Sequence, residues 1–253
     1  MEPVLVGTSH GTDDPAGQHA VRALLDGVRA ARPGLDVREA FVDVQQPEVA
    51  DVLTQAVADA GSAVVVPLLL STGYHVRVDI AEAVAGVNAA SSAGAPGAAG
   101  AAAAAALPLG PDPRLVDILA DRLADVAPRP DDVLVLAAAG SSVAAAADAV
   151  EEVARGLAER VGRPVVASYG AGATPRVPDA VSAARASSGP GARVVVVSYL
   201  LAPGYFLDRV LEAGADVVSE PVAGSPYAEK ADPRLVELVL DRYDAAATAL
   251  RRR

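Results

Sequence analysis

The chain has 253 residues, of which 52% are hydrophobic and 21% charged, so it can bury a large core as one large domain or two smaller ones. Its net charge of −11 argues against general nucleic-acid binding, which needs a basic surface. The absence of Cys excludes disulfides, thiolate zinc sites, Cys-ligated iron–sulfur clusters and Cys nucleophiles.

The N-terminal stretch MEPVLVGTSHG has neither a basic segment nor a long apolar one, so it lacks the pattern of a signal peptide. The Ala-rich residues 98–107 are too few to cross a membrane, which takes about 20 apolar residues. We therefore expect a cytoplasmic protein with no nucleic-acid partner and no membrane partner.

Short apolar runs alternate with longer amphipathic segments from the N-terminus onward. The short runs predict strands, and the segments with apolar residues at helical spacing predict helices. The predicted strands cover 4–6, 35–42 and 63–70, and the predicted helices cover 16–31, 47–60 and 77–88. This alternation is typical of βαβ units, with a parallel sheet and right-handed crossovers.

The Ala-rich residues 89–106 interrupt this alternation. They predict a surface loop whose last residues form a poor fourth strand. Asp112 and Pro113 then have the residue types expected at the N-cap and first position of a helix over 112–125. Residues 127–132, APRPDD, are predicted to link two domains.

After this linker the pattern of the first half begins again. Three pairs of segments match: VLVGTSHGT from Val4 with VLVLAAAGSS from Val133, AVVVPLLLSTGYH at 63–75 with VVVVSYLLAPGYF at 194–206, and DPRLVDILADR at 112–122 with DPRLVELVLDR at 232–242. Repeats of this kind indicate two homologous units. The sequence therefore predicts an α/β fold of two doubly wound parallel-sheet halves, residues 1–127 and 131–253, with a cleft between them.

Three polar side chains occur in the first half only. His10, Asp43 and His75 follow the three predicted strands in turn, and the aligned residues of the second half are Ala139, Ala171 and Phe206. A structural role would have been needed in both halves. The difference therefore favours a functional role for the three polar side chains.

The geometry of a parallel sheet groups these three side chains. The carboxyl ends of neighbouring strands lie at one edge, about 4.8 Å apart, which is where open α/β folds bind their ligands. Two imidazoles and a carboxylate suit a borderline divalent cation such as Fe, Co, Ni or Zn. Three protein ligands would leave coordination positions open for exchange or chemistry.

Other interpretations of the same residues remain. GTSHGT, at 7–12, could cradle a phosphate, although it lacks both GxGxxG and the P-loop Lys. Ser9, His75 and Asp43 could form a nucleophilic triad, although TSHGT is not the GxSxG elbow. His19 lies off the apolar face of its predicted helix, so we expect it to be solvated.

The motifs LVGTSHGTDDP, FVDVQQP, PLLLSTGYHVRVDI and LPLGPDPRL together resemble the sirohydrochlorin chelatases of the CbiX/SirB type. The resemblance covers essentially the whole chain, in a fused two-half form. It implies an ATP-independent class II chelatase that inserts Fe²⁺ for sirohaem or Co²⁺ for cobalamin, with the metal as substrate and without a nucleotide or redox cofactor.

The resemblance also implies site residues. His10 and His75 would bind the metal, and Asp43, where the family often has Glu, would assist catalysis. Sirohydrochlorin carries many carboxylates, so Arg77 is the first candidate for substrate binding and Arg209 the second. Tyr74, with Tyr205 and Phe206, would flank the flat ring, although both Tyr positions recur in the repeat and could equally serve packing. Ser9 and Gly11 complete the expected substrate-binding set. Because the second half departs from the pattern at every catalytic position, the resemblance implies one site per chain.

Two rival functions use the same residues. A non-catalytic carrier of metal or tetrapyrrole would occupy the same cleft, although it would have less need of a proton acceptor such as Asp43. A metal-dependent hydrolase would be expected to have more carboxylate ligands. The fused halves allow a functional monomer.

Overall fold

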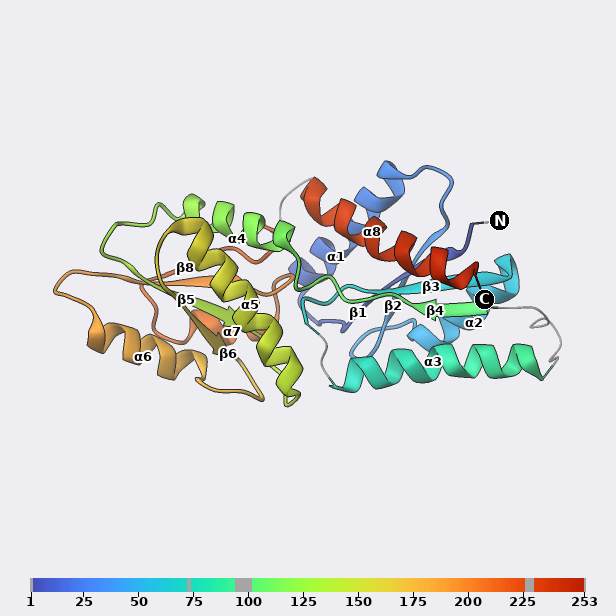
Figure 1. Cartoon of the computed structure of the whole chain (residues 1–253), viewed down its shortest axis with the longest axis horizontal. Helices are drawn as coiled ribbons and strands as arrows, with labels where there is room; N and C mark the ends of the chain where they lie inside the picture. The colour runs from blue at the N-terminus through green and yellow to red at the C-terminus, as the bar shows by residue number, and fades with distance from the viewer. Residues whose placement is uncertain (1, 72–73, 94–101, 226–229, 253) are drawn as a thin grey trace.

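The computed structural model describes residues 2–71, 74–93, 102–225 and 230–252, and for residues 74–77 it describes the backbone alone (Figure 1). The first half contains β1 (Val4–Ser9), α1 (Pro15–Ala31), β2 (Val37–Phe41), α2 (Val49–Ala60), β3 (Ser62–Pro67), α3 (Tyr74–Ser92), β4 (Ala102–Ala105) and α4 (Pro113–Asp125). The second half contains β5 (Val133–Ala138), α5 (Ala144–Val161), β6 (Val165–Tyr169), α6 (Val177–Ser187), β7 (Val194–Tyr199), α7 (Tyr205–Leu211), β8 (Val217–Val218) and α8 (Pro233–Leu250).

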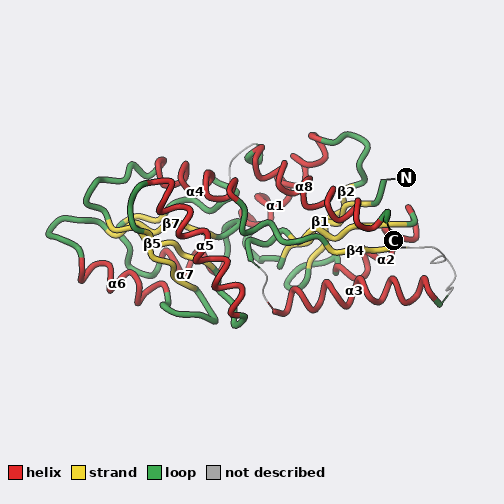
Figure 2. Tube along the Cα trace, in the orientation of Figure 1, coloured by secondary structure: helices red, strands yellow, loops and turns green. Residues whose placement is uncertain are grey.

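Each half has a four-stranded parallel sheet, and the two sheets have the same topology. Their strand orders are β2-β1-β3-β4 and β6-β5-β7-β8. The registers also correspond, since Ser9 pairs with Phe41 in the first sheet and Ala138 pairs with Tyr169 in the second. Figure 2 shows both sheets flanked by helices. The predicted fold class, two homologous α/β halves with parallel sheets, is confirmed.

Alternate residues of the strands pack against opposite layers of helices. Val4 and Val6 of β1 face α2 and α3, whereas Leu5 belongs to a cluster that includes residues of α1 and α8. That cluster continues into the second half, where it includes Leu134 and Leu136 of β5 and residues of α4 and α5. One continuous core therefore joins the halves on one side of the sheets, while each half keeps a separate core on the other side.

The two halves exchange their last helices. α4 follows β4 in the chain but packs against α5 and β7 of the second half. α8 ends the second half but packs against α1, β3 and β4 of the first (Figure 1). The division at 127–131 therefore describes the sequence repeat, whereas each packed unit contains one helix from the other half.

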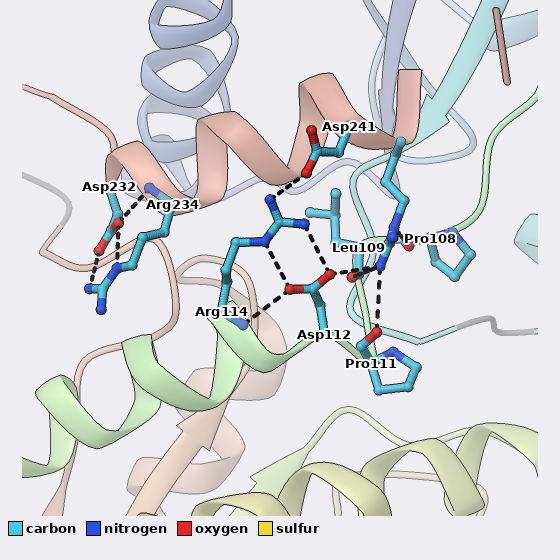
Figure 3. Close-up of polar contacts among 9 residues, drawn as sticks. Pro108, Leu109, Pro111, Asp112, Arg114, Asp232, Arg234 and Asp241 are labelled. Atoms are coloured by element: carbon cyan, nitrogen blue, oxygen red, sulfur yellow. Dashed lines mark hydrogen bonds and ion pairs between the residues drawn. The ribbon is translucent and has the colours of Figure 1, made fainter. Parts of the chain in front are cut away.

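The repeated sequence DPR explains how each exchanged helix is anchored at its start. The Asp112 carboxylate accepts the backbone N–H of Arg114 at 3.0 Å, which caps α4. The Arg114 guanidinium binds Asp112 at 2.9 Å and also Asp241 of α8 at 2.6 Å (Figure 3). In the second copy, Arg234 binds its own cap Asp232 and Asp121 of α4, at 2.7 and 2.8 Å. The two exchanged helices are thus joined by reciprocal ion pairs.

The arginine that ends each repeat fixes the loop that precedes the other exchanged helix. Arg242 donates to the carbonyl oxygens of Pro108 and Leu109 at 2.8 and 3.0 Å. Arg122 occupies the same place in the second half, 3.3 Å from the carbonyl oxygen of Pro221. The match between 112–122 and 232–242 therefore has a structural cause, since both copies make the same contacts.

Several predicted boundaries are corrected. The third strand ends at Pro67 and not at residue 70, because Leu70 is buried at the junction of the halves, where its carbonyl oxygen accepts the Tyr199 hydroxyl at 2.9 Å. The helix predicted over 77–88 extends to Ser92, as its Ala-rich end favours. It begins at Tyr74, so His75 lies in the first helical turn.

The segment around the predicted linker is held in place by ion pairing and hydrogen bonds. The Asp132 carboxylate is buried, binds Arg193 at 2.6 Å and accepts the backbone N–H of Arg129 at 2.7 Å. The hydrogen bond from Arg193 outweighs burial and lowers the pKa of Asp132 to about 2. The connection between the repeats is therefore fixed to the start of β7.

Within the described ranges, no helix combines the length and apolar character needed to cross a membrane.

Candidate functional site

The carboxyl ends of β1 and β2 bring two of the predicted site residues together. The Val42 backbone N–H donates to the Ser9 carbonyl oxygen at 3.0 Å, and the Asp43 N–H donates to the His10 carbonyl oxygen at 3.2 Å. Both His10 and Asp43 are exposed to solvent. The edge of the sheet therefore carries an imidazole and a carboxylate from adjacent chain segments, as the sequence predicted.

Gly11 permits this close approach. Its φ is +93°, and a Cβ at this position would lie 2.7 Å from the Asp43 carbonyl oxygen. The next residue, Thr12, donates its backbone N–H to Gln45 Oε1 at 2.9 Å. Gly11 thus has a structural reason to be glycine, because any side chain would separate the two loops. Ser9 is buried, whereas Gly11 is half-buried, so Ser9 is the less accessible of these two residues predicted to bind substrate.

The Asp43 side chain also shapes its own loop. Its Oδ1 accepts the Val44 backbone N–H at 2.8 Å, and Val44 has a φ of 51°, which is unusual for a β-branched residue. The aligned residue of the second half is Gly172, with a φ of 70°. The first half therefore keeps a left-handed turn beside its carboxylate without the glycine that eases such a turn.

His75, Tyr74 and Arg77 lie in the first turn of α3, where their side chains fall outside the described part of the structure. The segment after β3 runs beside β1, since the Leu68 N–H donates to the Thr8 carbonyl oxygen at 2.8 Å. β1 lies between β2 and β3, so positions 43, 10 and 75 follow three adjacent strands. Whether the His75 side chain reaches the other two stays a prediction.

The second half shows what the corresponding positions do when all three polar groups are missing. The Ala171 N–H donates to the Ala139 carbonyl oxygen at 2.8 Å, the same bond that joins Asp43 to His10. Phe206 packs over Gly170, where a Cβ would lie 2.8 Å from the ring and 3.1 Å from the Ala139 carbonyl oxygen. In this half the three corresponding positions converge at the sheet edge.

A loop of the second half touches the first half beside His10. A Cβ on Gly204 would lie 2.9 Å from Thr12 Oγ1, and one on Gly17 would lie 2.3 Å from the Pro203 carbonyl oxygen. These contacts, with the bond between Thr12 and Gln45, were not predicted. The sequence gives one hint of these contacts: Thr12 comes two residues after His10, and Gln45 comes two residues after Asp43.

The described residues leave the metal-binding set incomplete. Apart from the side chains of 74–77 and the other undescribed residues, no three His, Cys, Asp or Glu residues are grouped so that they could hold a metal ion. Two surface grooves, of about 1340 Å³ between α1 and α8 and about 520 Å³ between α4 and α5, lie away from His10 and Asp43. The exposed His19 lines the larger groove, as expected for a solvated helix residue.

Comparison with known proteins relates both halves to one family and the whole chain to one fold. The family model CbiX matches residues 4–126 and again 133–246. The structure of SirB from Bacillus subtilis with Fe³⁺ is similar with a TM-score of 0.77 and 22% identity, over 98% of this chain and 96% of that one. The sirohydrochlorin chelatase SirB from Bacillus subtilis subspecies spizizenii, in complex with cobalt, gives 0.74 and 20%, over 100% and 98%.

A multi-domain protein from Deinococcus radiodurans with structural similarity to chelatases has a TM-score of 0.61 and 20% identity, over 95% of this chain and 55% of that one. A search of curated proteins gave no match. At these identities the solved structures establish only the fold of the chain. The two matches to the CbiX family model establish that both halves are related to that family.

Proposed function

Because the chain belongs to the CbiX family, we propose that it is a sirohydrochlorin chelatase that inserts Fe²⁺ or Co²⁺ into the tetrapyrrole. The observation that carries the proposal is the backbone hydrogen bond that joins His10 to Asp43 after β1 and β2, next to β3, which α3 follows in the chain. No nucleotide or redox cofactor takes part. The metal ion is a substrate, and the two structurally similar SirB proteins were solved with iron and with cobalt.

His10 and His75 would hold the metal ion before transfer. Neutral imidazoles bind borderline divalent ions well, and a site with few protein ligands can give up its ion to four ring nitrogens. His10 is exposed after the end of β1, so an ion bound there is open to a ligand on its outer side.

Asp43 would accept protons from the ring. Insertion breaks two pyrrole N–H bonds, forms four metal–nitrogen bonds and releases two protons, so the reaction needs a base near the ion. Asp43 Oδ1 is already bonded to the Val44 N–H, and no described residue bonds Oδ2. That free oxygen is the atom we assign to the proton transfer.

The second half supports the place given to His75. Phe206, its counterpart, contacts the residue between Tyr169 and Ala171, next to the Ala139 carbonyl oxygen. The same geometry in the first half would place the His75 side chain beside His10 and Asp43. Arg77 and Tyr74 from the same helical turn, with Ser9 and Gly11, remain proposed contacts for the substrate.

Multiple turnover tests the proposed function. Purified protein at substoichiometric concentration is mixed with sirohydrochlorin and Co²⁺ or Fe²⁺, and metal insertion is followed by the absorption spectrum. We expect many equivalents of metallated product per chain. Asp43→Asn should lower the rate about 100-fold, because general-base catalysis contributes about that much. Asp51→Asn, which removes an exposed carboxylate from α2, is the matched control and should leave the rate unchanged.

A carrier of metal or tetrapyrrole would give another pattern. It would bind its ligand once per chain, with insertion no faster than in the absence of protein. Asp43→Asn would then have no effect on the rate, and the chelatase proposal would be wrong.

A further inference from the structure

Tyr205, at the start of α7, differs from the other tyrosines whose side chains the structure describes. Tyr169, Tyr199 and Tyr243 are buried, and their hydroxyl groups donate hydrogen bonds. Tyr205 is 69% exposed, and its hydroxyl has no partner among the described residues. Since the position recurs in both halves, a packing role was an alternative, but this exposure argues against it.

Phe206 extends the aromatic surface. Its ring lies 5.4 Å from that of Tyr205, in an edge-to-face arrangement with an interplanar angle of 75°. Its ring also contacts Gly170, and the side chain is half-buried against the apolar cluster of the second half that includes Val135 and Ala137. In a chain with only 3% aromatic residues, an exposed ring beside a half-buried one is a specific feature.

A cation lies beside these rings. The Arg176 guanidinium donates to the carbonyl oxygen of Gly170, the residue against which Phe206 packs. Arg176 is exposed, and no carboxylate in the described ranges forms an ion pair with it. Its counterpart in the first half is Glu48, as the matching bridges of Tyr169 with Arg176 and Phe41 with Glu48 show. The sheet edge of the second half therefore carries a positive charge where the first half carries a negative one.

This surface is held next to the candidate metal site. Gly204, which precedes Tyr205, contacts Thr12, and Thr12 is bonded to Gln45 in the loop that follows Asp43. The φ of Gly204 is 144°, and a Cβ there would come within 2.9 Å of Thr12 Oγ1. The start of α7 is therefore fixed against the loop that follows His10.

We propose that Tyr205, Phe206 and Arg176 form the surface of the second half that binds the tetrapyrrole. Flat rings contact the macrocycle, and the guanidinium pairs with one of its carboxylates. The inference rests on the proposed function and extends it, because it gives the second half a role in substrate binding in place of the metal binding it lacks. These three residues position the substrate, and none of them takes part in proton transfer.

Binding of metal-free sirohydrochlorin, measured by fluorescence titration, tests the proposal without any insertion step. Tyr205→Ala should raise the dissociation constant about 5- to 10-fold, as expected for one lost aromatic contact. Arg176→Gln should raise the dissociation constant about 10-fold at low salt and by less at high salt, because ions screen an exposed charge. Binding of Co²⁺ and the melting temperature should match the wild type in both variants.

Matched controls separate these contacts from general surface effects. Leu211→Ala truncates a side chain on the same helix that is 57% exposed, and Arg155→Gln removes an exposed guanidinium from α5. Both should bind sirohydrochlorin like the wild type. Equal weakening in the controls and the test variants would overturn the proposal.

The remaining outcomes are distinct. If the wild type binds no sirohydrochlorin, the proposed function itself fails. If the wild type binds and metallates it while Tyr205→Ala and Arg176→Gln bind it equally well, only this inference fails. If Tyr205→Ala instead abolishes a dimer seen in sedimentation and leaves binding unchanged, the rings form a contact between two copies of the chain, and the inference is wrong.

Discussion

His10, Asp43 and His75 stand at positions where the second half has only nonpolar residues. The backbone hydrogen bond that joins His10 to Asp43 is preserved between Ala139 and Ala171, so the turn does not need the polar side chains. The backbone of this turn is therefore kept without them, which supports a functional role for the polar side chains of the first half.

Gly11 is the residue whose replacement should separate the two loops of the site. Gly11→Ala places a Cβ 2.7 Å from the Asp43 carbonyl oxygen, in addition to the cost of a positive φ. Gly34 also has a positive φ, +102°, but a Cβ there would meet nothing within 4 Å. We expect Gly34→Ala to lower the free energy of unfolding by about 1 kcal/mol, and Gly11→Ala by about 2–3 kcal/mol.

Chemical denaturation and the insertion assay measure both effects. Gly11→Ala should also lower the insertion rate at least 10-fold, a loss that Gly34→Ala should not show. Equal stability and equal rates for the two variants would contradict the role given to Gly11.

Among the elements, the exchanged helices α4 and α8 depend on their capping aspartates. Burial alone would raise the pKa of Asp112, but hydrogen bonds from the Arg114 side chain and backbone, with the charges of Arg114 and Arg242, lower it overall. A carboxylate whose native pKa is lowered stabilises the fold fully above its unfolded pKa, about 4, and loses that contribution as the pH falls through the native value.

Asp112→Asn should therefore lower the free energy of unfolding by about 2 kcal/mol at pH 7, through loss of a charged cap and of its ion pairs. The difference from the wild type should shrink as the pH falls below about 4. Asp26→Asn removes a carboxylate that is 71% exposed and should change stability by less than about 0.5 kcal/mol. Denaturation between pH 3 and 7 measures this, and a difference that grows at low pH would contradict it.

The sequence predicted the helices and strands of each half better than it predicted which sheet each helix packs against. Apolar periodicity gave most helices and strands, and the expected parallel arrangement correctly placed His10 near Asp43. Periodicity could not show that α4 packs on the other sheet, because its apolar face, with Leu115, Ile118 and Leu119, suits either one. For Tyr205 the sequence left open whether it flanks the ring or packs in the core, since its exposure depends on how the halves dock.

At the scale of the whole molecule, the halves meet around the Leu70 carbonyl oxygen. It accepts the Tyr199 hydroxyl at 2.9 Å, and a Cβ on Gly110 would lie within 2.3 Å of both oxygen atoms. Burial raises the pKa of Tyr199, so the hydroxyl stays protonated and donates. This contact fixes the second half against the segment that leads to α3.

Tyr199→Phe should lower the free energy of unfolding by about 1–2 kcal/mol, because it leaves a buried carbonyl oxygen without a donor. It should also slow metal insertion severalfold, since the segment before His75 loses its anchor. Tyr243→Phe removes a buried hydroxyl that donates to the Pro3 carbonyl oxygen and is the control. The control should lose comparable stability and keep the wild-type rate. Equal rates for the two variants would show that the junction does not position the site.

We claim that His75 completes a single metal-inserting site in the first half. The most direct test is the initial rate at which the His75→Ala variant inserts Co²⁺ into sirohydrochlorin. We expect this rate to fall at least about 100-fold with an unchanged melting temperature, because a metal ligand is lost. His19→Ala, which removes an exposed histidine from α1, should insert metal at the wild-type rate. A His75→Ala rate equal to that of the wild type would contradict the claim.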